Sequence, residues 1–402
     1  MKPTMSSQLG YAKAVQWLDQ CHWRFLQGTL VALKRISLAS PKETPTTIVV
    51  LRNCFFGDYV VVIPALRALR SAFPRARIVL LTASSFAAAW RHRPQYNGVF
   101  DLEPGLLDQV VHFSNADLRS GVRRAELRAQ IGGDASSLSL ALCYSATGLF
   151  ARLQRVVLCR LLGLPFPLGL TGTPTMPAQR VFNRWRVGRP DVPHQYQAAL
   201  GSVNELLHQY GLPSATFDLP IQTLHAGRGT QSLVIGVAPF TKQPVKQWPL
   251  QRFAELMAAV AQETGASFEI YGAPDEQEMA IQLNTMLGGR VMVSSLCGAL
   301  SPLELRRRLE AVHLLVCLDS GPMHVASLVG TPVVALFSQI TLHQFWRPWG
   351  PNGTLLSSPV PCAQCDTRNG QCPQGTQACI EGISLDAVLQ QVRMALLKTT
   401  AP

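Results

Sequence analysis

The chain is poor in charged residues, and poorest in acidic ones. Charged side chains make up 15% of its 402 residues and hydrophobic ones 47%, so the composition disfavours global disorder and allows large cores. Only 24 acidic residues stand against 36 basic ones, which gives a formal net charge of +12. That balance predicts attraction to anions such as nucleic acid, anionic lipid or phosphorylated substrates.

Long hydrophobic runs are also missing. No stretch of 18 uncharged apolar residues occurs, so we expect no transmembrane helix. The polar N-terminus lacks the apolar core and small-residue cleavage site of a secretory signal. We therefore expect a cytoplasmic protein whose ten cysteines are mostly reduced thiols. Residues 1–45 are predicted to form an N-terminal helical extension, which either packs on the body of the protein or lies on a membrane surface.

Four motifs of nucleotide and hydrolase chemistry are absent from the sequence. There is no DxD pair, no GxxxxGK[ST] loop, no GxGxxG fingerprint and no GxSxG elbow. Their absence disfavours kinases, NAD-dependent enzymes and esterases. Affinity for phosphate would then have to come from lysines and helix N-termini.

What the chain does contain is two series of short β-branched runs alternating with helical patterns. The first predicts a β-α-β unit and hence a parallel sheet with a right-handed crossover. Its predicted strands are 47–52, 75–83, 99–103, 109–113 and 137–146, with helices over 59–74 and 194–213. A hinge is predicted at 223–231. The second series predicts strands over 232–240, 267–274, 291–296, 314–319 and 332–337, and helices over 249–265, 275–287, 301–312 and from 322.

We therefore predict an α/β protein with two Rossmann-like domains, over 46–225 and 226–402. Ligands of open α/β sheets sit outside the carboxyl ends of the strands, so the strand-to-helix turns are the candidate sites. In the first such turn Gly57 allows a tight bend and Asp58 opens a helix. Asp58 is either an N-cap or a functional carboxylate.

Three further turns lie in the second domain. Thr241, Lys242 and Lys246 follow a strand and could bind an anion near a helix start, or be solvated surface residues. Asp275 and Glu276 could bind ribose hydroxyls or complement a helix dipole. In the turn 319–324, Ser320 or Gly321 would be the N-cap and Pro322 the first helical residue. The free N–H groups there make a phosphate cradle, with Asp319 and His324 beside it; a capped core helix is the alternative.

Four of the cysteines crowd together near the end of the chain. They are spaced C-x2-C-x6-C-x6-C: Cys362, Cys365, Cys372 and Cys379. The first pair has the spacing of a zinc ligand pair, and four thiolates could close a structural tetrahedral site. Unmetallated thiols and a local disulfide are the alternatives, because the later spacings are not those of a standard zinc ribbon.

Taken in order, these motifs resemble glycosyltransferase family 9, the ADP-heptose:lipopolysaccharide heptosyltransferases. The similar blocks are "IVVLRNCFFGDYVVVIPALRALRSAFPRARIVLLT", "KQWPLQRFAEL", "LCGALSPLELRRRLEAVHLLVCLDSGPMHVASLVGTPVVALF" and the cysteine-bearing "CAQCDTRNGQCPQGTQACIEGISLDAVL". The resemblance covers about 47–90 and 233–390. It implies a GT-B fold, two Rossmann-like domains facing a central cleft, and inverting transfer without a catalytic metal.

The resemblance also implies a role for each matching residue. Asp58 corresponds to the catalytic base. The donor would be held by Thr241, Lys242, Lys246, Glu276, Asp319, Ser320, Gly321 and His324, with Lys246 stabilising the leaving diphosphate. The acceptor side would include Asn53, Phe55, Phe56 and Gly57. The two phenylalanines depart from the small or polar residues usual in the family, and this puts the acceptor in doubt.

The expected function is transfer of heptose, or a related sugar, from a nucleotide-diphosphate donor to an anionic lipid-linked saccharide. The basic charge suits such an acceptor and peripheral contact with the inner face of the cytoplasmic membrane. A GT-B nucleotide-sugar epimerase and a non-catalytic nucleotide-sugar-binding protein are the alternatives. Nucleic acid is not an expected partner, because no aromatic–basic interleaving or known module supports it.

Overall fold

The structure, a computed structural model, describes most of the chain as two compact units. The described residues are 44–53, 55–84, 98–132, 137–142, 149–165, 167–168, 194–218, 232–340, 343–362 and 371–400. The predicted hinge at 223–231, Cys365 and nearly all of the predicted extension 1–45 lie outside them. Among the described residues, no helix is both long and apolar enough to cross a membrane.

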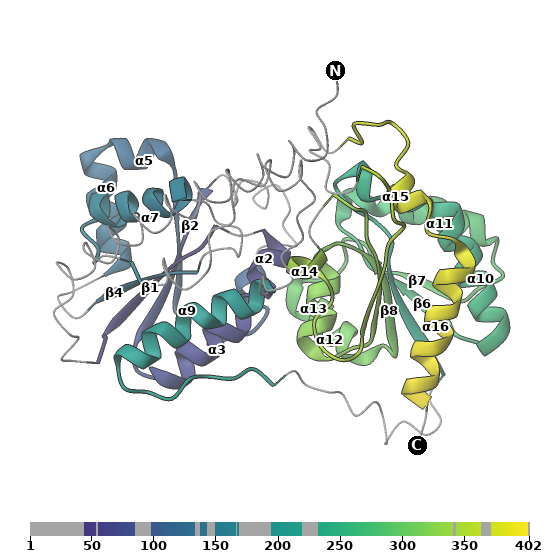
Figure 1. The fold of residues 1–402 in the computed structure, drawn as a ribbon, viewed down its shortest axis with the longest axis horizontal. Helices are drawn as coiled ribbons and strands as arrows, with labels where there is room; N and C mark the ends of the chain where they lie inside the picture. Colours follow the sequence, from purple (N-terminus) through teal and green to yellow (C-terminus); the bar gives the residue numbers. More distant parts are fainter. Residues whose placement is uncertain are drawn as a thin grey trace, which may run out of the picture. The chain divides into compact units, whose positions relative to one another are not determined.

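Unit 1 contains a four-stranded parallel sheet in the order β3-β2-β1-β4 (Figure 1). The strands are β1 (Thr47–Leu51), β2 (Arg77–Ala83), β3 (Gln109–Phe113) and β4 (Leu138–Ala141). Its helices are α3 (Ile63–Ala72), α5 (Asn115–Arg119), α6 (Gly121–Ile131), α7 (Leu149–Leu162) and α9 (Gln195–Gln209). Alternate residues of every strand point to opposite faces, and both faces of β1 are fully buried.

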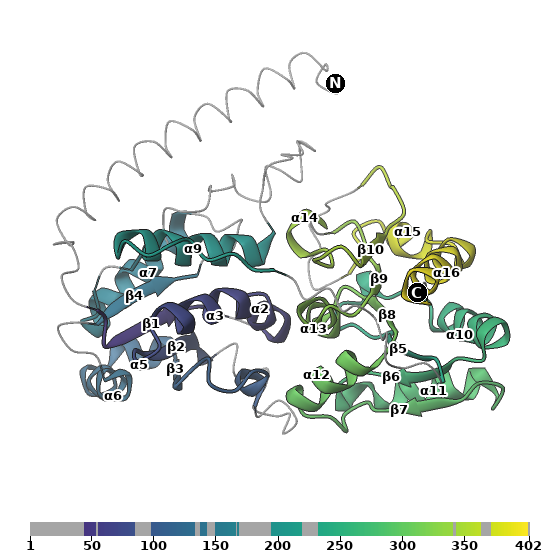
Figure 2. The ribbon, with the colours of Figure 1, turned by 90° about the horizontal axis from the view of Figure 1, so that it is seen from below.

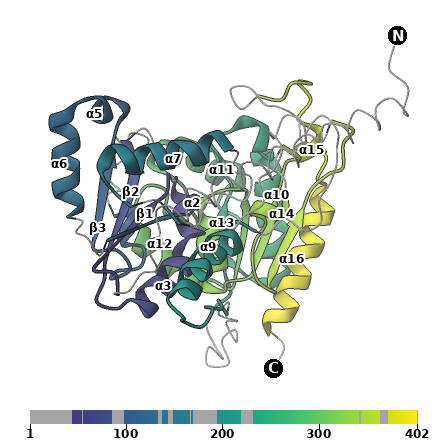
Figure 3. The same cartoon turned by 60° about the vertical axis from the view of Figure 1, so that its left-hand side comes forward.

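Helices cover both faces of this sheet. One core cluster joins Val49 and Leu51 of β1 to Leu127 of α6 and Leu158 of α7. α3 and α9 pack against each other (Figure 2), and Figure 3 shows α6 and α7 beside the strands. Two covered faces explain why the strands are continuous apolar runs, as the sequence predicted.

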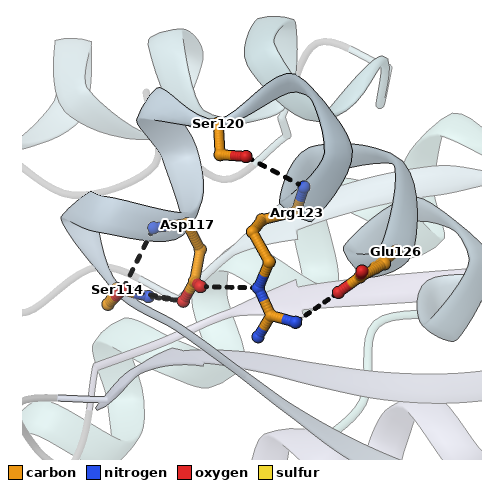
Figure 4. Close-up of polar contacts among 5 residues, drawn as sticks. All are labelled: Ser114, Asp117, Ser120, Arg123 and Glu126. Atoms are coloured by element: carbon orange, nitrogen blue, oxygen red, sulfur yellow. Dashed lines mark hydrogen bonds and ion pairs between the residues drawn. The ribbon is translucent and has the colours of Figure 1, made fainter.

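The turn after β3 is built from a capping box. Ser114 accepts the Asp117 N–H at 3.1 Å, and the Asp117 carboxylate accepts the Ser114 N–H at 2.8 Å (Figure 4). Asp117 also pairs with Arg123, whose guanidinium contacts Glu126. These polar side chains hold the α5–α6 corner of unit 1 together.

Unit 2 contains a six-stranded parallel sheet in the order β10-β9-β8-β5-β6-β7. The strands are β5 (Val234–Ala238), β6 (Ser267–Ile270), β7 (Val293–Ser295), β8 (Leu314–Leu318), β9 (Val333–Leu336) and β10 (Gly353–Leu356). Its helices are α10 (Leu250–Thr264), α11 (Gln277–Leu287), α12 (Pro302–Ala311), α13 (Gly321–Val329), α14 (His343–Trp346), α15 (Ala378–Glu381) and α16 (Leu385–Thr400). One core cluster joins the sheet to α10, α11 and α16. The short 3₁₀ helices η3 (Pro244–Lys246) and η4 (Pro274–Glu276) follow β5 and β6.

Two segments that precede 217 in the chain belong to unit 2. Their described parts are 55–61, with α2 (Phe56–Val60), and 98–104, with the 3₁₀ helix η2 (Val99–Asp101). The Tyr59 hydroxyl donates to the Phe100 carbonyl at 3.1 Å and joins the two segments. The division of the chain into two domains at a single position near 225 stays a prediction. The sequence did not predict that these two segments belong to unit 2.

The fold class is confirmed, α/β with two Rossmann-like parallel sheets, but two predicted elements are wrong. The strand expected at 99–103 is the η2 turn, where the Asp101 N–H bonds to the Gly98 carbonyl. The single helix expected over 59–74 is two helices, α2 and α3, separated at Val61 and Val62. Pro64 has no N–H to bond the carbonyl of Val60, and its ring would clash there, so a continuous helix cannot form.

Candidate active site

The strand order of unit 2 reverses between β5 and β8. From β5 the chain moves outward to β6 and β7, and then returns to β8 on the other side of β5 before moving to β9 and β10. The crevice beyond the carboxyl ends of the strands at such a reversal is where open α/β sheets bind ligands. Thr241 follows β5 and Asp319 follows β8, so two predicted site turns flank this position.

A cavity of about 430 Å³ lies at these strand ends. Its volume is in the usual range for small-molecule sites. Ten residues predicted from the sequence line it, all within unit 2: Phe55, Phe56, Gly57, Thr241, Lys242, Lys246, Glu276, Asp319, Ser320 and Gly321. Turns that are far apart in the sequence are thus brought to one site.

Lys246 and Asp319 form an ion pair at the floor of the cavity. The Lys246 Nζ lies 2.7 Å from Asp319 Oδ2, and the two side chains are only 14% and 10% exposed. Because few water molecules reach them, their charges are weakly screened. An incoming diphosphate therefore meets an ammonium group held in place by a carboxylate, in surroundings of low dielectric.

Lys242 forms a second, more exposed pair in the same cavity. Its Nζ lies 2.7 Å from Asp275 and 2.9 Å from Glu276. Glu276 is nearly buried, and its other oxygen accepts the Ala273 N–H at 2.6 Å. Asp275 is half exposed and does not line the cavity. Glu276 is thus both a cap for its 3₁₀ turn and a carboxylate that faces the cavity.

Two helices begin at the cavity wall. Ser301 caps α12 through a capping box with Glu304, and Ser320 is the N-cap of α13. The Ser320 side chain does not cap α13; Pro322 has no N–H and the Met323 N–H bonds the Ser320 carbonyl, so the Gly321 N–H is the first-turn group that faces the cavity wall. Helix N-termini attract anions through these groups and the helix dipole. The start of α13 therefore adds to the pull of the lysines on phosphate, whereas the start of α12 is already capped by Ser301 and carries the Glu304 carboxylate.

Two glycines let α2 approach α13 closely. A Cβ on Gly321 would lie 2.5 Å from the Phe56 ring, and one on Gly57 would lie 2.9 Å from the ring of His324. Neither distance leaves room for a side chain. The Gly57–Asp58 turn is therefore packed directly on the helix that carries the Asp319–Gly321 loop.

His324 lies behind this wall and does not line the cavity. It is 3% exposed and stacks edge-on against Trp346 at 5.8 Å. Burial, opposed by Asp319 and reinforced by Lys246, lowers the pKa of His324 to about 4. The imidazole is therefore neutral at physiological pH, and its role in binding the donor stays a prediction.

Asp58, the residue after the lining residue Gly57, does not itself line the cavity. It is the third residue of α2, and its carboxylate accepts the Phe55 N–H at 2.9 Å. Asp58 is therefore not the N-cap of α2 but lies in its first turn, where its side chain bonds the backbone of the N-cap residue Phe55. Asn53 lies in unit 1, where its side chain accepts the Ala83 N–H at 2.9 Å.

Apolar residues that the sequence did not single out complete the cavity. They are Phe240, Tyr271, Leu296, Leu300, Pro302 and Leu305. Burial and the bond to Glu269 raise the pKa of Tyr271, so its hydroxyl stays protonated and donates to Glu269 at 2.6 Å. Phe240, Tyr271 and Leu296 stand close after strand ends, a signal that could have found them, whereas Pro302 and Leu305 belong to α12 and carry no such signal. The cavity thus has a charged floor and an apolar side, as a nucleotide needs.

Three of the four clustered cysteines are described. Cys379 is buried, and the neighbouring thiols of Cys372 and Cys362 help raise its pKa, after burial. Although burial opposes it, backbone N–H groups of residues 374–377 lower the pKa of Cys372. Among the described residues, no group of three or more metal-binding side chains is arranged to hold an ion. The predicted zinc site includes Cys365, which is not described, and stays a prediction.

Proteins similar to this chain include several named as heptosyltransferases. An Escherichia coli protein named lipopolysaccharide heptosyltransferase 3 is 32% identical over 129 residues, 32% of this chain and 37% of that protein. The match therefore spans little more than a third of that relative. A solved glycosyl transferase family 9 structure from Veillonella parvula is 20% identical with a TM-score of 0.58, covering 88% of this chain and 98% of that one.

The structure of E. coli ADP-heptose lps heptosyltransferase II is 17% identical with a TM-score of 0.55, covering 88% of this chain and all of that one. These likenesses show the fold, which is the GT-B architecture that the resemblance implied. The family model for glycosyltransferase family 9 (heptosyltransferase) matches residues 157–374, just over half of the chain and most of the cavity-lining residues. The chain belongs to glycosyltransferase family 9 (heptosyltransferase).

Proposed function

We propose that the protein transfers heptose, or a closely related sugar, from a nucleotide diphosphate to a lipopolysaccharide-type, lipid-linked saccharide. The donor is proposed to be ADP-heptose, which the name of one solved relative contains. The reaction is proposed to invert the anomeric centre and to need no catalytic metal. The protein would act in the cytoplasm, at the inner face of the membrane that holds the acceptor.

The observation that carries this proposal is the nearly buried Lys246–Asp319 pair at the floor of the cavity. Departure of a nucleoside diphosphate develops negative charge on a phosphate oxygen. A lysine held in a site of low dielectric stabilises that charge, which a divalent metal does in other enzymes. The Gly321 N–H at the start of α13 would support the same oxygen atoms.

Asp58 is the proposed general base. The acceptor hydroxyl oxygen would attack the anomeric carbon while its proton passes to the Asp58 carboxylate, and the bond from that carbon to the diphosphate oxygen would break. What supports this role is that Asp58 directly follows Gly57, which lines the cavity. The bond from the Phe55 N–H to Asp58 holds the carboxylate in one orientation.

The donor is proposed to span the cavity from the charged floor to the apolar side. Lys246, the Gly321 N–H and Thr241 would hold the diphosphate, and Asp319 the sugar hydroxyls. Glu276 would accept a hydrogen bond from a ribose hydroxyl, and Lys242, now paired with it, would turn to a phosphate. The nucleobase would lie among Leu296, Leu300 and Leu305.

The decisive experiment compares Asp58→Ala with Asp117→Ala. Both residues are the third of their helix and accept a backbone N–H three residues earlier, at 2.9 and 2.8 Å. Neither lines the cavity, but Asp58 directly follows the lining residue Gly57 in unit 2, whereas Asp117 lies in unit 1. We expect Asp58→Ala to abolish transfer while ADP affinity stays within about twofold, and Asp117→Ala to keep transfer. Transfer that persists in Asp58→Ala removes the base assignment.

Donor binding by the wild type separates the remaining alternatives. Binding of an ADP-sugar with turnover to an epimer, and no transfer, would identify an epimerase. Binding with neither reaction would identify a non-catalytic binding protein. If no nucleotide sugar raises the melting temperature, the enzyme proposal fails, because a ligand at about 100 times its Kd stabilises by about 2.7 kcal/mol.

A structural zinc on Cys362, Cys365, Cys372 and Cys379 is a separate part of the proposal. The backbone N–H groups around Cys372 favour its thiolate, the form that binds zinc. Metal analysis of the purified protein should find about one zinc per chain, and less in Cys372→Ser. An equal metal content in both proteins would contradict the assignment.

A further inference from the structure

Helix α7 of unit 1 has apolar residues on the side that faces away from the protein. Leu153 is 40% exposed and Val157 is 55% exposed. Gln154 and Arg160 are also exposed, and Leu161 is partly so. At 100° per residue these five side chains fall on one side of the helix, within about 120° of arc. We call this set the outer face of α7: Leu153, Gln154, Val157, Arg160 and Leu161.

The opposite side of α7 is the side that packs against the core of unit 1. Leu158, Cys159 and Leu162 are buried in the core of unit 1, against the sheet. A helix that only covered a sheet would be expected to turn polar residues outward. Three aliphatic residues on the outer face therefore have no explanation in the core of unit 1.

The charged residues of α7 all have one sign. The sequence of α7 contains three arginines and no acidic residue. Arg160 is exposed on the outer face, and no ion pair is found for it within the described part of the chain. Arg128 of α6 lies at the end of the same helix, where its guanidinium donates to the Leu161 carbonyl at 2.8 Å. The outer face thus combines aliphatic side chains with exposed guanidinium groups.

We propose that the outer face of α7, together with Arg128, docks onto the surface of an anionic phospholipid bilayer. A helix lying in the membrane interface inserts its apolar side chains a few ångströms below the headgroups, while basic side chains pair with lipid phosphates. Leu153 and Val157 are the inserted side chains. Arg128 and Arg160 contact the headgroups. The inference stands on α7 and α6 alone and does not need the transfer reaction.

Charge argues against a second copy of the chain as the occupant. Two copies meeting at this face would bring Arg128 and Arg160 of each against those of the other. Like charges at an interface oppose association, whereas an anionic membrane neutralises them. The whole chain, at +12, adds attraction to a negative surface over a longer range.

The test is sedimentation of the full-length protein with vesicles, without donor or acceptor. Wild type should bind vesicles with about 30% phosphatidylglycerol in phosphatidylcholine, and bind pure phosphatidylcholine much less. Leu153→Glu with Val157→Glu should weaken binding at least about tenfold, since both lost apolar contacts and new charges act against insertion. Arg160→Gln should weaken it about fivefold and reduce its salt dependence.

Ile281→Glu is the matched control, because Ile281 is 67% exposed on α11 of unit 2. It should bind vesicles as wild type does. Circular dichroism and melting temperature verify that the α7 variants are folded. The proposal is overturned if wild type ignores anionic vesicles, or if the α7 double variant binds them equally well.

Self-association is measured on the same proteins. A wild-type dimer that the double variant loses, with vesicle binding unchanged, would identify a second copy as the occupant and overturn the proposal. Turnover of a detergent-dispersed acceptor by the double variant should equal that of wild type. If wild type does not bind vesicles, the proposed transfer reaction is not contradicted. If wild type does not turn over the acceptor, the docking proposal is not contradicted.

Discussion

Both units have a parallel sheet whose strand order reverses, but the residues at the two reversals have different roles. In unit 1 the strand order reverses between β1 and β4. There Arg52, only 1% exposed, donates across the reversal to the Leu142 carbonyl at 2.7 Å, and Asn53 accepts the Ala83 N–H. In unit 2 the reversal lies between β5 and β8, and Lys246 and Asp319 form an ion pair there that lines a cavity.

The difference lies in what the polar groups bind. In unit 1 the side chains named above bond backbone groups of their own unit, so a ligand would have to compete with the fold itself. In unit 2 the Lys246 ammonium and the Asp319 carboxylate pair with each other. A ligand phosphate, which is negative like the carboxylate, can therefore take the place of Asp319 beside Lys246. The topology is shared, and the residues at the strand ends decide which reversal can be a site.

The sharpest test of this comparison is Lys246→Met. We expect kcat/KM for transfer to fall by about 10²–10³-fold, because the leaving diphosphate loses its charge partner. The nearly buried Asp319 also loses its partner, so folding should be weakened as well. Transfer kinetics and nucleotide affinity measure the first effect, and denaturation the second.

Lys242→Met is the control for that variant. Lys242 lines the same cavity but is 48% exposed, so its charge is screened by water. Transfer should fall by about tenfold or less. Equal losses in the two lysine variants would show that burial of the Lys246–Asp319 pair does not matter.

The counterpart in unit 1 is Arg52→Met. The Leu142 carbonyl loses a charge-assisted donor in a buried place, so unit 1 should be destabilised by about 2–3 kcal/mol. Hydrogen exchange of the β1 and β4 amides should quicken accordingly, while those of β5 and β8 stay unchanged. Nucleotide affinity should not change, and a tenfold loss of it would mean that Arg52 acts on the site.

Most strands of unit 2 could be predicted because the chain marks their ends locally. A buried parallel strand is a short apolar run, and here a proline, glycine or polar residue stands within a few positions of the end of β5, β6, β8 and β9. Thr241, Glu276 and Asp319 were found for that reason, since they stand directly after such runs. The helix over 385–400 and β10 were missed, because neither was bounded by as clear a signal.

Contacts between distant segments could not be predicted. Gly57 has to be a glycine because His324 lies against it, and Gly321 because Phe56 lies against it. In each pair the two residues are far apart in the sequence. His324 was expected to face the cleft, but α13 turns it into the core, where Trp346 packs on it. The sequence gives the period of a helix but not the rotation that its neighbours impose.

His324 makes the stability of unit 2 depend on pH. Its pKa is lowered to about 4, chiefly by burial. The Asp319 charge raises the pKa, and the Lys246 charge lowers it further. In the unfolded chain the imidazole takes up a proton near pH 6.5, while the folded form stays neutral. Stability is therefore full above pH 6.5 and is lost as the pH falls toward 4, by about 2 kcal/mol between pH 7 and 5.

His324→Gln should lack this part of the pH dependence. Denaturation of both proteins at pH 7 and pH 5 gives the difference, because carboxylates contribute almost equally to each. In unit 1, hydrogen exchange of β1 should be the same in the two proteins at both pH values. An identical loss of stability in wild type and variant would mean that His324 is already solvated or paired when folded.

The smallest effect compares two helix caps of the same design. Ser114 caps α5 and Ser301 caps α12, each in a box with an acid three residues later, but only Ser301 lines the cavity. Replacing either serine by alanine should cost about 1 kcal/mol of stability in its own unit. Ser301→Ala should also weaken ADP binding by about threefold, because a poorly capped α12 presents its start to the ligand less firmly. Ser114→Ala should leave ADP affinity unchanged. Isothermal titration with ADP on both variants decides the matter: if the two affinities move together, capping alone is responsible, and the position of the cap at the unit 2 strand ends carries no function.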